Sequence, residues 1–242
     1  MISFRKAIIV LSLLVQVVHV ADAKIYLVSA GVSDYPGEGK DLTLCAADAR
    51  TIAWLYGKNS GAETMLLLDG NATAENITKA ITSVLGKAGE SDIAVFFFSG
   101  HGVRGGFVAY DKVLTYEEVR KAMTRSKSKN KMIFADACFS GKIRTSERQD
   151  EQVSAAKKAN VMLFLSSRSN ETSIERKSMK NGFFTTYLQK GLRGHADKNR
   201  DRTITARELF DYVHQGVADI SQGRQHPVMW GNFPDNMPVM KW

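Results

Sequence analysis

One cysteine and one histidine in this chain each follow an apolar run and are each accompanied by glycine. Cys138 lies in D-A-C-F-S-G after residues 132–135, and His101 lies in S-G-H-G after residues 93–98. Such runs are typical of strands buried on both faces of a parallel sheet. We expect each strand to stop before these residues, and groups at the carboxyl ends of neighbouring parallel strands gather at one edge. A thiol beside a base is the minimum that nucleophilic catalysis requires.

The remaining apolar runs predict the elements that position this pair. Further strands are expected at 24–30, 63–68 and 161–165, and helices begin near residues 45, 73, 115, 182 and 205. Short apolar strands that alternate with helical segments predict an α/β fold, a three-layer αβα sandwich around a mostly parallel sheet. The glycine-rich segment 103–114 is expected to form a hairpin or lid over the site.

The amino-terminal residues 1–23 have the pattern of a secretory signal. Arg5 and Lys6 precede an apolar run at 7–20, and A-D-A at 21–23 matches a cleavage site. An uncleaved membrane anchor is the alternative, but the run is shorter than the roughly 20 residues that a spanning helix needs. We therefore expect an exported protein, periplasmic or secreted, with no stable membrane anchor and one domain at 24–242.

The charge of the chain does not indicate a nucleic-acid-binding protein. Its 33 basic and 25 acidic residues give a formal net charge of +8. The basic residues are scattered or gather in probable loops, and no basic stripe interleaved with aromatic residues is present. Solvated surface is the better interpretation, so we expect no nucleic-acid partner.

The paired motifs S-G-H-G and D-A-C-F-S-G resemble those of the caspase-like cysteine peptidases. A-G-V-S-D-Y, L-C-A-A-D-A and N-G-F-F-T-T-Y-L agree with this resemblance, which covers residues 24–214 and is closer to the metacaspase-like bacterial branch than to animal caspases. It implies a caspase-like fold and a cysteine endopeptidase that works with a dyad of His101 and Cys138. Taken singly, a buried cysteine and a loop histidine would be ordinary structural residues.

The chemistry expected of this pair is peptide hydrolysis. His101 would take the proton of Cys138 and later return one to the departing amine. The backbone N–H groups of Gly102 and Cys138 are suited to stabilise the oxyanion. No third residue is assigned to orient His101, and no cofactor is required for the chemistry.

Substrate choice is expected to depend on acids beside Cys138. Asp136 should line the pocket for the side chain before the scissile bond, where a carboxylate attracts arginine or lysine. By resemblance to the metacaspases, Asp48 is the second acid of this pocket and Cys45 the cysteine beside it. Two acids favour arginine over lysine. The alternative for Asp48 is an ordinary acid in the first turn of a helix, and the alternative for Cys45 and Cys138 is a disulfide.

The polar segment 142–158, which follows Cys138, is expected to be a mobile loop. It contains several lysines and arginines, so it is a candidate for self-cleavage that activates the enzyme, and a plain surface loop is the alternative.

Residues 197–208 follow the spacing of a twelve-residue EF-hand calcium loop. Arg202 stands where such loops usually have glycine, so weak calcium binding and a metal-free helix cap are both open. The candidate ligands are Asp197, Asn199, Asp201, Thr203 and Glu208.

Two other functions remain as alternatives to the peptidase. The first is a non-catalytic caspase-fold protein that binds partners through the same cleft, and the second is a secreted calcium-binding module. The dyad argues against the first, and the second leaves His101 and Cys138 unexplained.

Overall fold

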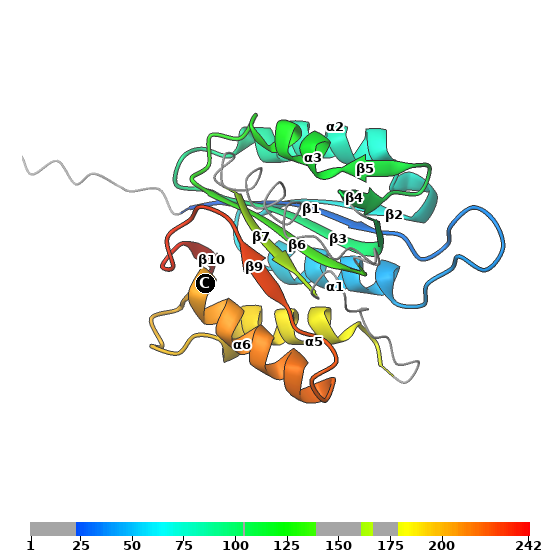
Figure 1. Cartoon of the computed structure of the whole chain (residues 1–242). Helices are drawn as coiled ribbons and strands as arrows, with labels where there is room; N and C mark the ends of the chain where they lie inside the picture. Colours follow the sequence, from blue (N-terminus) through cyan, green and yellow to red (C-terminus); the bar gives the residue numbers. More distant parts are fainter. Residues whose placement is uncertain (1–22, 104, 139–160, 167–178) are drawn as a thin grey trace, which may run out of the picture.

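The computed structural model of this chain describes residues 23–103, 105–138, 161–166 and 179–242. Within them, a central sheet has the strand order β2-β1-β3-β6-β7-β9 (Figure 1). All neighbouring pairs from β2 to β7 run parallel, and β9 joins antiparallel at the edge. The strands are β1 (Ile25–Gly31), β2 (Glu63–Leu68), β3 (Ile93–Val103), β6 (Asn130–Cys138), β7 (Val161–Leu165) and β9 (Val228–Trp230).

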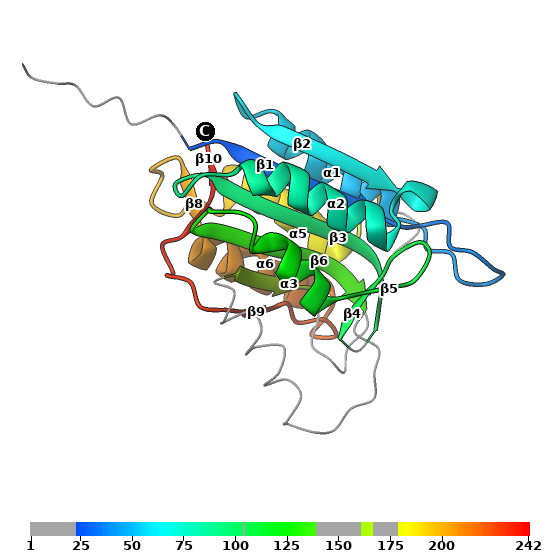
Figure 2. The same ribbon diagram turned by 90° about the horizontal axis from the view of Figure 1, so that it is seen from above.

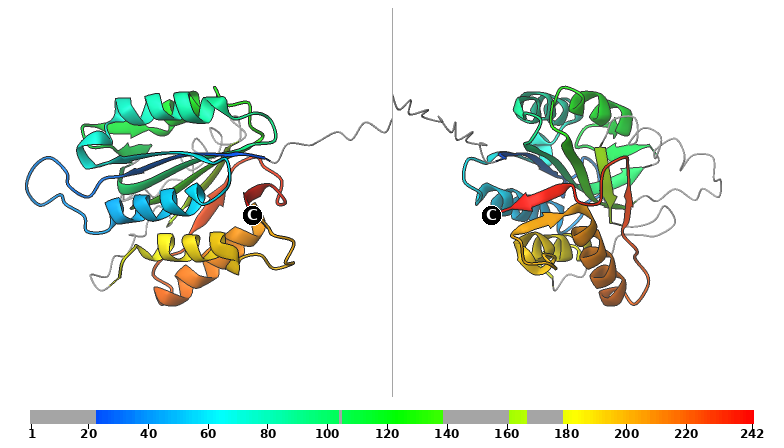
Figure 3. Two further views of the ribbon diagram at one scale, coloured as in Figure 1. Left: turned by 180° about the vertical axis from the view of Figure 1, so that it is seen from behind. Right: turned by 90° about the vertical axis from the view of Figure 1, so that its left-hand side faces the viewer.

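Helices cover both faces of this sheet, which confirms the three-layer αβα sandwich. Figure 2 shows α2 (Ala74–Val84) and α3 (Tyr116–Met123) lying across one face. The two views of Figure 3 show the three layers from behind and from the side. The opposite face carries α1 (Cys45–Gly57), α5 (Phe183–Lys190) and α6 (Ala206–Ile220).

The phenylalanines of β3 show how the sequence builds the two cores. Side chains alternate between the faces of a strand. Phe96 and Phe98 accordingly pack into the core under α2 and α3, and Phe97 packs into the core under α1, α5 and α6. All three are fully buried, as expected for a central parallel strand.

Hydroxyl side chains define the starts of several helices. Thr73 caps α2 by accepting the N–H of Asn76. Thr115 with Glu118, and Thr205 with Glu208, form complete capping boxes at α3 and α6. In contrast, α5 starts at Gly182 with no capping side chain of its own, and it passes at Lys190 into a π-helical turn, Gly191–His195.

Two strand ends differ from the sequence prediction. β3 does not stop at residue 98 but continues through His101 to Val103, and β6 includes Cys138 as its last residue. The physical reason is pairing: β6 accompanies β3 up to His101, and the hairpin of β4 (Gly106–Val108) and β5 (Val113–Thr115) continues from Gly102 and Val103. The expected hairpin at 103–114 is thereby confirmed.

The short strands β8 (Thr203–Thr205) and β10 (Pro238–Lys241) form a separate antiparallel pair beside α6. The predicted signal at 1–23, apart from Ala23, and the predicted loop at 142–158 lie outside the described residues. Within the described part of the chain, no helix is both long and apolar enough to cross a membrane.

Candidate active site

His101 and Cys138 are brought together by the register of two adjacent strands. In the parallel pair of β3 and β6, Ser99 lies opposite Asp136 and His101 lies opposite Cys138. The pairing therefore joins residues that are far apart in the chain at one edge of the sheet, as expected. The side chain of Cys138 is not among the described ones.

The imidazole of His101 is held by a backbone carbonyl. Its Nε2 atom lies 2.7 Å from the carbonyl oxygen of Lys40, in the loop between β1 and α1. Because a carbonyl oxygen only accepts hydrogen bonds, this contact places the proton of the neutral ring on Nε2. Nδ1 is then the atom with a lone pair, which is the atom a general base needs.

Tyr35 supports His101 from the same loop. Its ring packs against the imidazole with the centroids 4.8 Å apart. The Tyr35 hydroxyl accepts the backbone N–H of His101 at 2.9 Å and donates to the carbonyl of Val108 at 2.8 Å. Burial raises the pKa of Tyr35 above its usual range, so the phenol stays neutral and keeps its proton to donate.

Gly100 makes room for this tyrosine. A Cβ atom at position 100 would lie 2.6 Å from the Tyr35 hydroxyl, too close for a real contact. Tyr35 belongs to the motif A-G-V-S-D-Y, but its residue type alone does not indicate this contact with His101. The Lys40 contact carried no signal in the sequence at all, because every residue type has a carbonyl.

The two acids assigned to the substrate pocket lie side by side below this edge. Asp48 on α1 is 1% exposed and Asp136 on β6 is 7% exposed. Their Oδ2 atoms lie 3.4 and 2.6 Å from the point where a Cβ atom at Gly182 would be. The structure therefore places these predicted residues together, although Asp48 comes from a helix and Asp136 from a strand.

Three hydrogen bonds, from β3 and from the start of α5, hold Asp48. Ser99 donates to its Oδ2 at 2.9 Å, and the side chain of Asn181 and the N–H of Gly182 donate to its Oδ1 at 2.8 and 3.1 Å. Burial, and secondly the charge of Asp136, raise the pKa of Asp48 well above its usual range, and these hydrogen bonds oppose that rise.

Thr185 of α5 holds the other acid. Its N–H and its hydroxyl donate to Asp136 Oδ2 at 3.2 and 2.9 Å. Neither Thr185 nor Asn181 was assigned in the sequence analysis. Both lie in or beside N-G-F-F-T-T-Y-L, so the motif was noticed, but only the fold shows which acids its polar residues contact.

Cys45 and Gly102 are both buried. Cys45 is the first residue of α1, three positions before Asp48. Gly102 is buried directly after His101 and pairs with Phe107 of β4. The oxyanion role of Gly102 and the pocket role of Cys45 stay predictions.

The EF-hand-like loop lies away from this site, at the end of the molecule opposite β4 and β5 (Figure 1). Asp197 accepts the N–H groups of Asp201 and Arg202, Asp201 accepts that of Thr203, and Glu208 accepts that of Lys198 besides capping α6. Arg202 adopts the left-handed backbone that glycine usually supplies, with φ of 66°.

These contacts show that Glu208 caps α6. Calcium binding by residues 197–208 stays a prediction. No group of three or more His, Cys, Asp or Glu side chains is arranged to hold a metal among the described residues.

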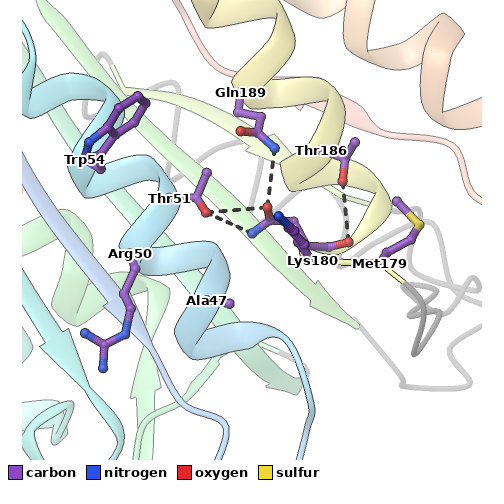
Figure 4. A pocket seen from close by; sticks show the side chains of 9 residues that line it. Ala47, Arg50, Thr51, Trp54, Met179, Lys180, Thr186 and Gln189 are labelled. Carbon is purple, nitrogen blue, oxygen red and sulfur yellow. Dashed lines mark hydrogen bonds between the residues drawn. The ribbon is translucent and has the colours of Figure 1, made fainter.

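An open pocket of about 650 Å³ lies between α1 and α5, on the outer side of the acids. Figure 4 shows Thr51 of α1 and Gln189 of α5, whose side chains both hydrogen-bond to Asn181. Asn181 lines this pocket and also donates to Asp48, so it connects the surface with the buried acids.

Comparisons with known proteins agree with this geometry. Residues 28–237 match the family model described as the caspase domain. A solved structure from Geobacter sulfurreducens is similar, with a TM-score of 0.66 and 18% identity over 90% of this chain and 97% of the other. Caspase-1 from Spodoptera frugiperda gives a TM-score of 0.65 and 15% identity over 90% of both chains. No curated protein sequence matches this chain.

Proposed function

Because this chain belongs to the caspase-domain family of cysteine peptidases, we propose that it is an endopeptidase that uses His101 and Cys138 as its catalytic dyad. The observation that carries the proposal is the register in which these two residues are direct partners on β3 and β6. The carbonyl of Lys40 supports it further, since it fixes the ring so that Nδ1 is the proton acceptor.

The reaction then follows in two stages. Nδ1 of His101 takes the thiol proton of Cys138, and the sulfur attacks the peptide carbonyl carbon. The N–H groups of Gly102 and Cys138 stabilise the oxyanion. As the C–N bond breaks, the imidazolium returns the proton to the leaving amine. Water, deprotonated by the same nitrogen, then attacks the thioester, and Cys138 leaves with its proton restored by His101.

We propose that the enzyme cleaves after arginine or lysine, with arginine preferred. Two buried carboxylates, Asp48 and Asp136, lie together beneath the edge that carries the dyad. An acid pair at low dielectric attracts a cation and repels the carboxylate of an aspartate side chain. The planar guanidinium fits such a pair better than an ammonium group does, because it donates in two directions.

Export and activation extend this proposal. The pattern of residues 1–23 supports cleavage before Lys24 and release from the membrane. Basic residues in 142–158 match the proposed specificity, so this segment would be cut by the enzyme itself. Amino-terminal sequencing of the exported protein, beside a Cys138→Ala variant, tests both: the signal cleavage should be common to both proteins and the internal cleavage confined to the wild type.

Peptide profiling tests the proposed function. The mature wild type, Cys138→Ala and Asp136→Asn are each incubated with peptide libraries that vary the residue before the scissile bond. We expect cleavage after arginine and lysine by the wild type, none by Cys138→Ala, and a selective loss for basic residues in Asp136→Asn. No cleavage of any peptide by the wild type, with tight binding to some of them, would support the non-catalytic binding protein instead.

A further inference from the structure

The start of α5 contacts both pocket acids, although α5 itself carries neither of them. Asn181 and Gly182 donate to Oδ1 of Asp48, and Thr185 donates twice to Oδ2 of Asp136. Asn181 is 5% exposed and Thr185 is fully buried, so these contacts are shielded from water. Hydrogen bonds from buried donors to carboxylates are among the stronger ones in proteins.

Asp48 and Asp136 also take the place of a capping side chain at the start of α5. The first N–H groups of a helix have no partner within it. Gly182 has no side chain to accept them, and the N–H of Thr185 is accepted by Asp136 from β6. Negative charge at a helix start is favourable, because the helix dipole is positive there. The acids and α5 therefore stabilise each other.

The amide of Asn181 is fixed in one orientation. Gln189 donates from Nε2 to Asn181 Oδ1 at 3.3 Å, while Nδ2 of Asn181 donates to Asp48 at 2.8 Å and to Thr51 at 3.1 Å. A flipped amide would set its oxygen against the carboxylate and its N–H groups against those of Gln189. An asparagine here consequently presents a donor to Asp48, which neither aspartate nor alanine can do.

We propose that Asn181 and Thr185 are positioning residues that set the specificity of the enzyme: Asn181 holds Asp48, and Thr185 holds Asp136, in the orientation that receives a cationic substrate side chain. The inference rests on the proposed specificity, and it assigns to the first turn of α5 a role beyond packing. Neither residue is placed at the reacting atoms.

The ionisation of Asp48 follows from the same contacts. Asp136 on β6 is the described group whose charge acts on Asp48, while β3 contributes the neutral hydroxyl of Ser99 and α5 the neutral donors Asn181 and Gly182. On α1 itself, Arg50 is exposed and lines the outer pocket. Asn181 favours the charged form of Asp48 by donating to it, so its loss raises the pKa of that carboxyl.

The test combines kinetics with a titration in the mature protein. Asn181→Ala and Thr185→Val are compared with the wild type on arginine, lysine and neutral peptides across pH. Asn59→Ala is the matched control, because Asn59 also donates from a partly buried amide but lies beyond the far end of α1. The carboxyl carbons of aspartates are titrated by NMR in the same proteins, with Asp48→Asn and Asp136→Asn to assign the signals.

We expect KM for arginine peptides to rise about tenfold in each variant while kcat stays within about threefold, as for the loss of one hydrogen bond to a charged group. In Asn181→Ala the acidic limb of kcat/KM moves to higher pH and Asp48 titrates at higher pH. The control should change neither.

Two results overturn the inference. One is an Asp48 carboxyl signal with the same pKa in the wild type and in Asn181→Ala, a comparison that needs no peptidase activity. The other is an unchanged KM for arginine in both variants. A wild type that cuts no peptide after arginine or lysine, with the Asp48 shift present, would instead refute the proposed specificity and leave the positioning of Asp48 by Asn181 standing. Thermal unfolding confirms that each variant is folded.

Discussion

The hydroxyl of Tyr35 lies between His101 and Val108, accepting the backbone N–H of the first at 2.9 Å and donating to the carbonyl of the second at 2.8 Å. One side chain thereby links the loop before α1 to the strand that carries His101 and to the hairpin beyond it. The edge at which His101 and Cys138 pair is held by contacts between segments that are distant in the chain.

Replacing this tyrosine tests that link. Tyr35→Phe leaves the partly buried N–H of His101 and the partly buried C=O of Val108 without their partner, which costs about 1 kcal/mol. We expect a lower melting temperature and a kcat/KM reduced about tenfold or more, because His101 loses its support.

Tyr56→Phe is the matched control for this change. It removes a hydrogen bond of the same kind, donated by the Tyr56 hydroxyl to the carbonyl of Val239 at 3.1 Å, in a more buried place away from His101 and Cys138. It should lower stability without lowering kcat/KM. Equal activity losses in the two variants would contradict a specific role for Tyr35.

The buried negative charge of Asp48 is expected to lower the folding stability of the protein at neutral pH. Burial and the neighbouring Asp136 raise the pKa of Asp48 above its ordinary value of about 3.8. A carboxyl whose pKa is raised by folding stabilises the protein below the unfolded pKa, and this stabilisation is lost as pH rises toward the folded pKa. Asp48→Asn removes the charge; its amide oxygen can still accept from Asn181 and Gly182, and its NH2 group can donate to the Ser99 hydroxyl instead of accepting from it.

The melting temperature of Asp48→Asn should therefore exceed that of the wild type at neutral pH by a few degrees, since about 1 kcal/mol corresponds to roughly 2–4 °C in a domain of this size. The difference should shrink below about pH 4. Cleavage after arginine should be largely lost. A variant less stable than the wild type at every pH would show that the charge is not costly.

Gly182 is expected to be intolerant of any side chain. A Cβ atom there would lie 2.6 Å from Asp136 Oδ2, so Gly182→Ala must displace the acid or the start of α5. We expect a loss of about 1–3 kcal/mol, typical of overpacking, with a raised KM for arginine peptides. In Gly86→Ala, where the nearest atom is 3.7 Å from the new Cβ, little change is expected, and equal effects at both positions would refute the steric argument.

Replacing Glu208 distinguishes a calcium-binding loop at residues 197–208 from a metal-free helix cap. Without calcium, Glu208→Ala should lose about 1 kcal/mol, because it breaks the capping box with Thr205. Glu118→Ala breaks the equivalent box of α3 and should lose a similar amount. If the loop binds calcium, millimolar calcium raises the melting temperature of wild type and Glu118→Ala but not of Glu208→Ala. No shift in any of the three would leave the helix cap alone.

Local patterns predicted most of the fold. The strands at 63–68 and 161–165 have the predicted bounds, and α2 and α6 begin near residues 73 and 205, as predicted. These features depend on apolar runs and on capping chemistry within a few residues. The predicted end of β3 at residue 98 was wrong. A strand continues as long as its neighbour pairs with it, and β6, the neighbour of β3, is distant in the sequence.

Only part of the candidate site could be predicted, because the rest depends on contacts between residues that are distant in the sequence. His101, Cys138 and Asp136 were predicted because their motifs follow apolar strands, and Asp48 was predicted only from the resemblance to the metacaspases. Lys40 acts through its carbonyl, and Asn181 and Thr185 act through contacts with acids over a hundred or about fifty positions earlier. No local pattern reports such contacts.

Covalent labelling tests the central claim most directly. A peptide probe that ends in arginine and carries a thiol-reactive ketone is added to the mature protein, and the modified residue is located by mass spectrometry. We predict one adduct, on Cys138, formed at least about a hundredfold more slowly in His101→Ala, while the same probe ending in aspartate does not react. Labelling that is independent of His101, or that occurs on another residue in preference to Cys138, would contradict the peptidase account.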